Sequence, residues 1–170
     1  MNGAPTSLSD NRAELPCTVA FPEIQSAVAW DATSSYFQAG IQPPTMLAGS
    51  SMSMILQQDS NNHVCWHVES FTGETVVLTA RLRVAGVNDD ANLMYDSVQH
   101  AYWRIREVNG YVYWDTSPNG QYWTNQRYEP TTGLDLSAVT VRLVCGTTGE
   151  YAWVLYGDGG YGDGVYGGGT

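Results

Sequence analysis

The chain has 170 residues, enough for one domain, and it combines 12% aromatic residues and 18 glycines with only 14% charged residues. Helical spacing of apolar residues is rare, so this composition favours a β-rich fold with many turns and argues against long helices. The net charge is −10 and all seven basic residues are arginine, so a nucleic-acid backbone is repelled on average. No apolar run approaches the roughly 18 residues of a membrane span, so we expect neither nucleic acid nor membrane as a partner.

The first fourteen residues are polar and lack an apolar core segment, which predicts an extended arm over 1–14 and argues against a signal peptide. We therefore expect either a mature form or a protein that is made in a cytoplasm and reaches its site without secretion, as a virion protein released by lysis would. Short strands are predicted over 15–21, 27–30 and 35–41, where prolines or polar residues interrupt the apolar positions.

Alternating apolar residues predict three strands in the next part of the chain, over 51–57, 63–69 and 75–84. The stretch 86–91 is predicted to be an acidic turn. Two arginine pairs, Arg81 with Arg83 and Arg104 with Arg106, share strand faces, and we expect them to pair with acids across strands rather than to form a basic patch.

His63, Cys65 and His67 project from one face of the predicted strand 63–69. Neighbours on one face lie roughly 6.6 Å apart along a strand, so two of them can converge on one metal ion if another strand supplies a further ligand. This trio is a candidate metal site, and the alternative is a row of ordinary polar side chains. The three cysteines, Cys17, Cys65 and Cys145, permit at most one disulfide and leave one thiol, whose default is burial.

The clearest pattern lies between residues 101 and 123, where two alternating strands flank Asn109-Gly110. This dipeptide is typical of a type I′ hairpin turn, because both of its positions tolerate positive φ. Ser117-Pro118-Asn119-Gly120 forms a second turn that leads into a third strand at Trp123. The alternation assigns four residues to the core: Trp103, Ile105, Val112 and Trp114.

The end of the chain is predicted to contain a polar connection over 128–137, a hairpin formed by 139–145 and 151–156, and a tail over 157–170 with eight glycines. Strands at this spacing, separated by turn residues, predict an all-β antiparallel β-sandwich or jelly roll of about ten to twelve strands. The expected organisation is an arm (1–14), a sandwich domain (15–156) and a Gly-rich tail (157–170).

The segment from Tyr95 to Thr124, with WRIRE, VYWDTSPNG and Trp123, resembles concanavalin A-like (laminin-G-like) jelly-roll domains. Such domains recur in actinobacterial extracellular proteins and in minor tail proteins of phages that infect those bacteria. The resemblance implies a β-sandwich but no reaction. Concanavalin-like glucanases place their catalytic acids in an E-x-D-x-E strand motif, which this sequence lacks, so we expect no enzyme activity.

Tyr102, Tyr111 and Tyr113 lie opposite the tryptophan face of their strands, with polar residues such as Asp115 and Asn119 nearby. Flat aromatic rings can stack on sugars while polar groups bind hydroxyls, so these five residues are the candidate glycan-binding site. Cross-strand packing is the alternative role for the tyrosines.

The sequence thus favours a non-enzymatic structural or adhesion protein of a phage virion, such as a minor tail or decoration protein. A free carbohydrate-binding module of an extracellular bacterial protein is the alternative, with a secreted location. Other virion subunits, further copies of the chain and a host glycan are the expected partners, and no cofactor is expected.

Overall fold

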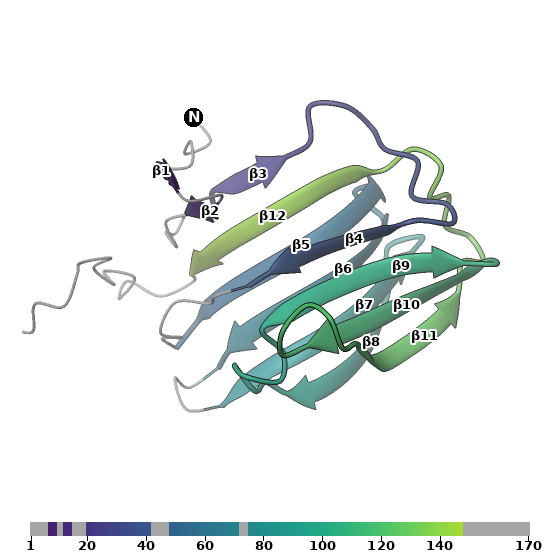
Figure 1. Ribbon diagram of the computed structural model, residues 1–170. Helices are drawn as coiled ribbons and strands as arrows, with labels where there is room; N and C mark the ends of the chain where they lie inside the picture. The colour runs from purple at the N-terminus through teal and green to yellow at the C-terminus, as the bar shows by residue number, and fades with distance from the viewer. Residues whose placement is uncertain (1–6, 10–11, 15–19, 42–47, 72–74, 148–170) are drawn as a thin grey trace, which may run out of the picture.

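The computed structural model describes residues 7–9, 12–14, 20–41, 48–71 and 75–147. Two antiparallel sheets pack face to face (Figure 1), which confirms the predicted all-β sandwich. No helix occurs among these residues, and therefore none that is long and apolar enough to cross a membrane.

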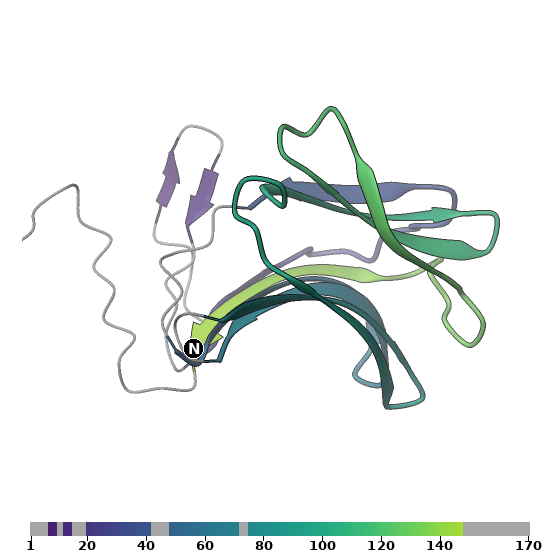
Figure 2. The same ribbon diagram turned by 90° about the horizontal axis from the view of Figure 1, so that it is seen from below.

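The larger sheet has six strands in the order β3-β12-β5-β6-β7-β8. In that order they are β3 (Glu23–Gln25), β12 (Thr140–Thr147), β5 (Ser50–Asp59), β6 (Asn62–Ser70), β7 (Val76–Val84) and β8 (Val87–Met94). The sheet is strongly bent, with its convex side toward the other sheet and its outer side concave (Figure 2).

The smaller sheet has four strands in the order β11-β10-β9-β4. They are β11 (Thr124–Pro130), β10 (Tyr111–Ser117), β9 (Tyr102–Val108) and β4 (Tyr36–Gly40). Two further strands, β1 (Ser7–Ser9) and β2 (Arg12–Glu14), pair only with each other, so the predicted arm contains a short hairpin. The predicted tail lies outside the described residues.

The core between the sheets follows the predicted alternation. Trp103, Ile105, Val112 and Trp114 are all buried, as the sequence indicated. They meet the inward residues of the six-stranded sheet, among them Met54, Trp66 and Leu78. Because one face of each sheet is apolar, stacking the two faces removes both from water.

Two indole groups tie the sheets together. The Nε1 of Trp66 on β6 donates a hydrogen bond to the carbonyl oxygen of Arg104 on β9 (3.2 Å), and the Nε1 of Trp114 on β10 donates to the carbonyl of Cys65 on β6 (3.0 Å). Each sheet therefore supplies one donor and one acceptor. These bonds satisfy indole N–H groups that burial would otherwise leave without partners.

The hairpin at Asn109-Gly110 is confirmed, since φ is 53° and 81° at the two positions. The prediction of an acidic turn over 86–91 is wrong, because the turn lies at Ala85-Gly86 and the acidic stretch forms strand β8. Acidic residues are tolerated there because β8 is an edge strand and its Asp90 pairs with Arg81 of β7.

Other strand boundaries also differ from the sequence prediction. Residues 27–30 form only one isolated bridge, between Trp30 and Val139, and the strand in this region is β3, after Pro22. Strand β11 runs to Pro130, so the polar connection begins later than predicted. Residues 15–19 and the predicted strand 151–156 lie outside the described ranges.

Candidate functional site

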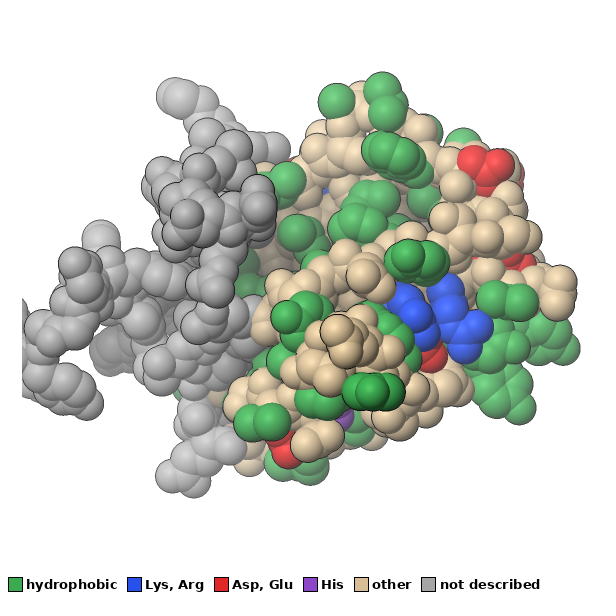
Figure 3. All heavy atoms as spheres, in the orientation of Figure 1, with side chains coloured by type: hydrophobic (Ala, Val, Ile, Leu, Met, Phe, Trp, Pro, Cys, Tyr) green, Lys and Arg blue, Asp and Glu red, His purple; other side chains and the backbone are tan. Residues whose placement is uncertain are grey.

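The outer face of the four-stranded sheet gathers aromatic and arginine side chains. Strand pairing places Tyr36, Arg106, Tyr113 and Tyr128 in one row across β4, β9, β10 and β11. In Figure 3 a compact group of arginine side chains lies among hydrophobic side chains on this side of the molecule. We call this surface the arginine–aromatic face; its members are Tyr36, Tyr102, Arg104, Arg106, Tyr111, Tyr113, Asp115, Trp123 and Tyr128.

Asp115 lies at the centre of the face, beneath two arginines, with only 1% of its surface exposed. Its Oδ2 accepts hydrogen bonds from the Nε of Arg104 (3.0 Å) and the Nε of Arg106 (2.7 Å), and its Oδ1 accepts one from Asn125 (3.0 Å). Both carboxylate oxygens are therefore occupied. The prediction that Asp115 contacts a sugar directly does not fit this burial, and its role is to hold the two guanidinium groups.

Aromatic rings also contact the guanidinium groups of Arg104 and Arg106. The guanidinium carbon of Arg104 lies 4.2 Å from the ring centroid of Trp123 and 5.9 Å from that of Tyr36. The guanidinium carbon of Arg106 lies 4.0 Å from the ring centroid of Tyr113. A cation is attracted to the face of an aromatic ring at these distances, so each guanidinium is fixed both by a carboxylate and by a ring.

Four tyrosine rings of the face remain open to solvent. The exposed fraction is 60% for Tyr36, 59% for Tyr128, 42% for Tyr111 and 36% for Tyr102. Tyr113 is half-buried, because its ring stacks on that of Tyr128 with centroids 5.7 Å apart. The face therefore offers several flat rings that are already held in place by neighbouring side chains.

Two glycines make room for the ring of Tyr102. A Cβ atom at Gly40 would lie 3.0 Å from the Tyr102 ring, and one at Gly120 would lie 3.2 Å from it. These contacts are tighter than side chains normally tolerate. Glycine at both positions thus allows the ring to lie close to the backbone of β4 and of the turn after β10.

Asn119, the last of the predicted glycan-binding residues, stabilises the turn between β10 and β11. Its Oδ1 accepts hydrogen bonds from the backbone N–H groups of Gln121 (3.0 Å) and Tyr122 (3.1 Å). An asparagine that bonds to the backbone two residues ahead is a common turn former. Its carbonyl oxygen is therefore engaged within the protein, although the residue itself is exposed.

Sequence reasoning missed several members of the face: Tyr36, Arg104, Arg106, Trp123 and Tyr128. The strand over 35–41 was predicted, but nothing local indicates that it pairs with β9 and brings Tyr36 beside Arg106. The predicted pairing of arginines with acids is confirmed for Arg104 and Arg106, which share Asp115, and for Arg81, which pairs with Asp90. Arg83 instead donates a hydrogen bond to Asn88.

His63, Cys65 and His67 occupy the outer, concave side of the six-stranded sheet, and they do not form a ligand set. In the parts of the chain that the structure describes, no group of three or more His, Cys, Asp and Glu side chains is arranged to hold a metal ion. Burial raises the pKa of the free Cys65 thiol to about 12, so the thiol is protonated at neutral pH. His67 instead shares a hydrogen bond between its Nδ1 and the Oγ of Ser53 (2.8 Å).

The pKa of His63 is lowered to about 4, first by burial and then by the charges of Arg83, Arg81 and Arg142, while Asp59 opposes the shift. His63 is therefore neutral at pH 7. Cys145 is disulfide-bonded, so the three cysteines supply one bonded residue and one free thiol in the described part of the chain.

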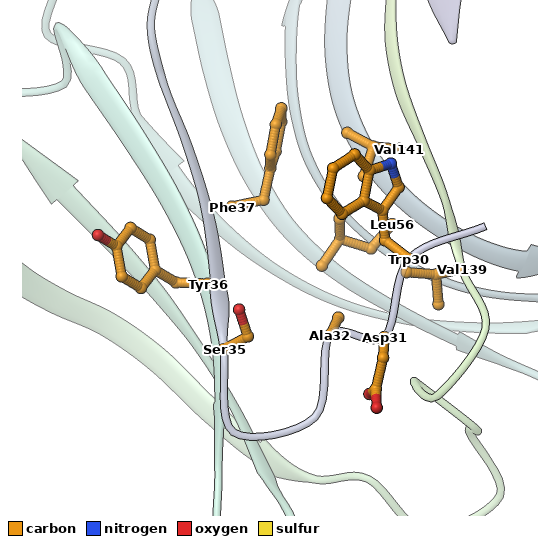
Figure 4. Close-up of a pocket in the computed structure, with 9 residues that line it drawn as sticks. All are labelled: Trp30, Asp31, Ala32, Ser35, Tyr36, Phe37, Leu56, Val139 and Val141. Carbon is orange, nitrogen blue, oxygen red and sulfur yellow. The ribbon is translucent and has the colours of Figure 1, made fainter. Parts of the chain in front are cut away.

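A small pocket lies between the two sheets near one end of β4 (Figure 4), with a volume of about 70 Å³. Figure 4 shows Tyr36 and Phe37 pointing to opposite sides of β4. The pocket is far smaller than the roughly 300–1,000 Å³ of typical ligand sites, so it does not hold a sugar ring. Its lining residues are Trp30, Asp31, Ala32, Ser35, Tyr36, Phe37, Leu56, Val139 and Val141.

No protein-family model matches the chain. A search of curated proteins gave no match either.

Several solved structures share the fold. A β-glucanase of Bacillus licheniformis is 13% identical with a TM-score of 0.54, and the alignment covers 86% of this chain and 65% of the glucanase. A Crh5 transglycosylase in complex with NAG is 14% identical with a TM-score of 0.56, covering 78% of this chain and 56% of that one. The CBM2 module of the evolved Dit protein of Lactobacillus casei BL23 phage J-1 is 6% identical with a TM-score of 0.56, covering 86% and 73%.

At these identities the likeness shows the fold, which is a jelly-roll, concanavalin A-like β-sandwich. The chain spans less than two thirds of the length of each of the two enzymes.

Proposed function

We propose that the chain is a non-catalytic, glycan-binding β-sandwich that serves as a structural or adhesion part of a phage virion. The observation that carries the proposal is the arginine–aromatic face, where exposed tyrosine rings lie beside fixed guanidinium groups on a rigid sheet. Such rings stack on the apolar faces of sugars, and the guanidinium N–H groups bind sugar oxygens.

The structural neighbours are compatible with this proposal. One is named a β-glucanase, one is a transglycosylase structure that contains NAG, and one is a CBM2 module of a phage Dit protein. The last of these is an example of a sandwich of this fold in a phage protein. A disulfide at Cys145 also favours an oxidising, extracellular environment, where such bonds persist.

We also propose that the chain has no catalytic activity. The acid at the centre of the face, Asp115, has both oxygens engaged by side chains and is shielded from solvent. A glycosidase needs a pair of carboxylates that reach the scissile bond. The sequence also lacks the E-x-D-x-E strand motif that places such acids in concanavalin-like glucanases.

Binding of the full chain to bacterial cell-wall polysaccharides, measured by affinity electrophoresis, tests the proposal. We expect the double substitution Tyr111→Ala with Tyr128→Ala to reduce binding at least tenfold, because it removes two exposed rings from the face. Phe71→Ala is the matched control, since Phe71 is equally exposed but follows β6 in the other sheet. Retention of wild-type binding by the double variant would overturn this assignment of the site.

The native mass of the full chain separates the virion role from that of a free carbohydrate-binding module. We expect a defined oligomer for a virion part, because such proteins are assembled with copies of themselves or with other subunits. A monomer that still binds glycan would favour the free extracellular module.

A further inference from the structure

The arginine–aromatic face carries more positive than negative charge, although the chain as a whole has a net charge of −10. Arg104 and Arg106 both pair with Asp115, which is the only carboxylate that either of them contacts among the described residues. Arg81, Arg127 and Arg142, by contrast, each have a carboxylate of their own. Two guanidinium groups against one carboxylate leave an excess of one positive charge on the face.

The arginines also keep unused hydrogen-bond donors. Arg106 reaches Asp115 through its Nε (2.7 Å), and neither of its Nη atoms donates to any residue that the structure describes. Arg81 differs, because its Nε and one Nη donate to the two oxygens of Asp90 (2.7 and 2.8 Å). The free edge of the Arg106 guanidinium therefore has the fork geometry that binds a carboxylate or a phosphate with two parallel hydrogen bonds.

From this excess charge and these free donors we infer that the face selects glycans bearing an acidic group, a carboxylate or a phosphate on the sugar. The inference rests on the proposed glycan-binding function and specifies its ligand class. A sugar ring stacks on an exposed tyrosine, and its acidic group pairs with Arg106. Tyr36 and Tyr113 flank Arg106 in the strand register, so a ring and a charge can be bound side by side.

The size of the basic group argues against a nucleic-acid ligand. Only two arginines contribute to it, whereas a long polyphosphate chain would run beyond them onto a protein that carries a net charge of −10. A glycan with one acidic group on a sugar unit matches the single excess positive charge of two guanidinium groups that share one carboxylate.

Matched pairs of polysaccharides that differ only in charge test the inference with the full chain. The pairs are polygalacturonate with its fully methyl-esterified form, and a monophosphorylated mannan with the same polymer after phosphatase treatment. We expect at least one charged polymer to bind about tenfold more tightly than its neutral partner, the effect of one charge-assisted hydrogen bond. The preference should shrink between 50 and 200 mM salt, because the acidic group is only partly shielded. The two pairs also distinguish a carboxylate from a phosphate as the preferred group.

The variant Arg106→Gln removes the free guanidinium edge but leaves Arg104 to neutralise Asp115, so the fold should persist, as thermal unfolding would verify. We expect it to lose the preference, so that the charged polymer binds the variant no more tightly than its neutral partner does. Arg83→Gln is the control, since Arg83 has no carboxylate partner among the described residues and lies on β7 in the other sheet. Its preference should equal that of the wild type.

The outcomes distinguish failure of the acidic-ligand inference from failure of the glycan-binding function. Equal binding of charged and neutral polymers, with no effect of Arg106→Gln, overturns the acidic-ligand inference but leaves the glycan-binding function. Absence of binding to all four polymers overturns both. Binding of a DNA oligonucleotide as tightly as the charged glycans would show a general polyanion site and also overturns the inference.

Discussion

Asp115 is the residue on which the geometry of the arginine–aromatic face depends. It is almost fully shielded from water, yet it carries a charge that two guanidinium groups and an amide must compensate. Burying a carboxylate is costly unless it is paired and hydrogen-bonded, so the four groups form one unit. Removing the charge at its centre leaves two nearby cations that repel each other.

We therefore predict that Asp115→Asn lowers the free energy of unfolding by about 3 kcal/mol, as expected when one partner of a buried ion pair is lost. Urea denaturation followed by tryptophan fluorescence measures this change. Asp90→Asn is the matched control, because Asp90 pairs with Arg81 on a more exposed surface; its expected cost is below about 1 kcal/mol. Equal costs for the two substitutions would contradict the central role of Asp115.

At the scale of elements, the hairpin of β9 and β10 was predictable because its signals are local. Alternation fixes which residues face the core, and Asn109-Gly110 supplies the two positive φ values that the turn requires. The sequence also predicted that Arg104 and Arg106 pair with acids. It could not show that both share Asp115, because this depends on the cross-strand register.

Features that depend on distant segments were not predictable in the same way. Tyr36 reaches the face only because β4 pairs with β9, and no local pattern encodes that pairing. Strand β8 was mistaken for a turn because its acidic residues suit a loop as well as an edge strand. Among the described residues, His63, Cys65 and His67 belong to no metal-binding group, since three side chains on one strand face do not converge unless a neighbouring strand contributes, and here β7 places Arg81 and Arg83 beside them.

The surroundings of His63 in the six-stranded sheet also determine how stability depends on pH. Burial and the arginines of β7 and β12 lower the pKa of His63 from 6.5 to about 4. Between these pH values the unfolded chain binds a proton at His63 that the folded chain does not. The folded state is therefore most stable above pH 6.5, and it loses stability as the pH falls toward 4.

We predict that the free energy of unfolding decreases from pH 6.5 to pH 4.5, with His63 contributing a slope of less than about 1.4 kcal/mol per pH unit, because the side chain is only half-buried and solvent screens the nearby charges. His63→Gln should reduce this slope without changing it above pH 7, as urea titrations at several pH values would show. Burial lowers the pKa of His67 and His100 too, so part of the slope should remain. An unchanged slope in His63→Gln would contradict the assignment.

At the scale of the whole molecule, Arg127 of β11 joins the two sheets. One Nη donates hydrogen bonds to the carbonyl oxygens of Ala80 and Asp89 in the six-stranded sheet, both at 2.8 Å. The other Nη pairs with the carboxylates of Asp89 (2.7 Å) and Glu129 (3.2 Å). The Arg127 side chain is buried, whereas the carboxylate of Asp89 is exposed and that of Glu129 is partly exposed, so its removal costs most at the buried carbonyl oxygen of Ala80.

We predict that Arg127→Met lowers the free energy of unfolding by about 2 kcal/mol, because it leaves the backbone carbonyl oxygens of Ala80 and Asp89 without their donor. Urea denaturation measures the loss. Arg81→Met, which removes a partly exposed arginine with one carboxylate partner, should cost less than about 1 kcal/mol. A change of that same small size in Arg127→Met would show that Arg127 does not hold the sheets together.

The cross-sheet bonds of Trp66, Trp114 and Arg127 have a mechanical consequence. The first and last strands of the sandwich, β3 and β12, both belong to the six-stranded sheet, whereas the arginine–aromatic face belongs to the other. Tension between a ligand held on that face and either end of the chain must therefore pass from sheet to sheet. The three bonded side chains, together with the packed core, resist the shear that such a pull would apply.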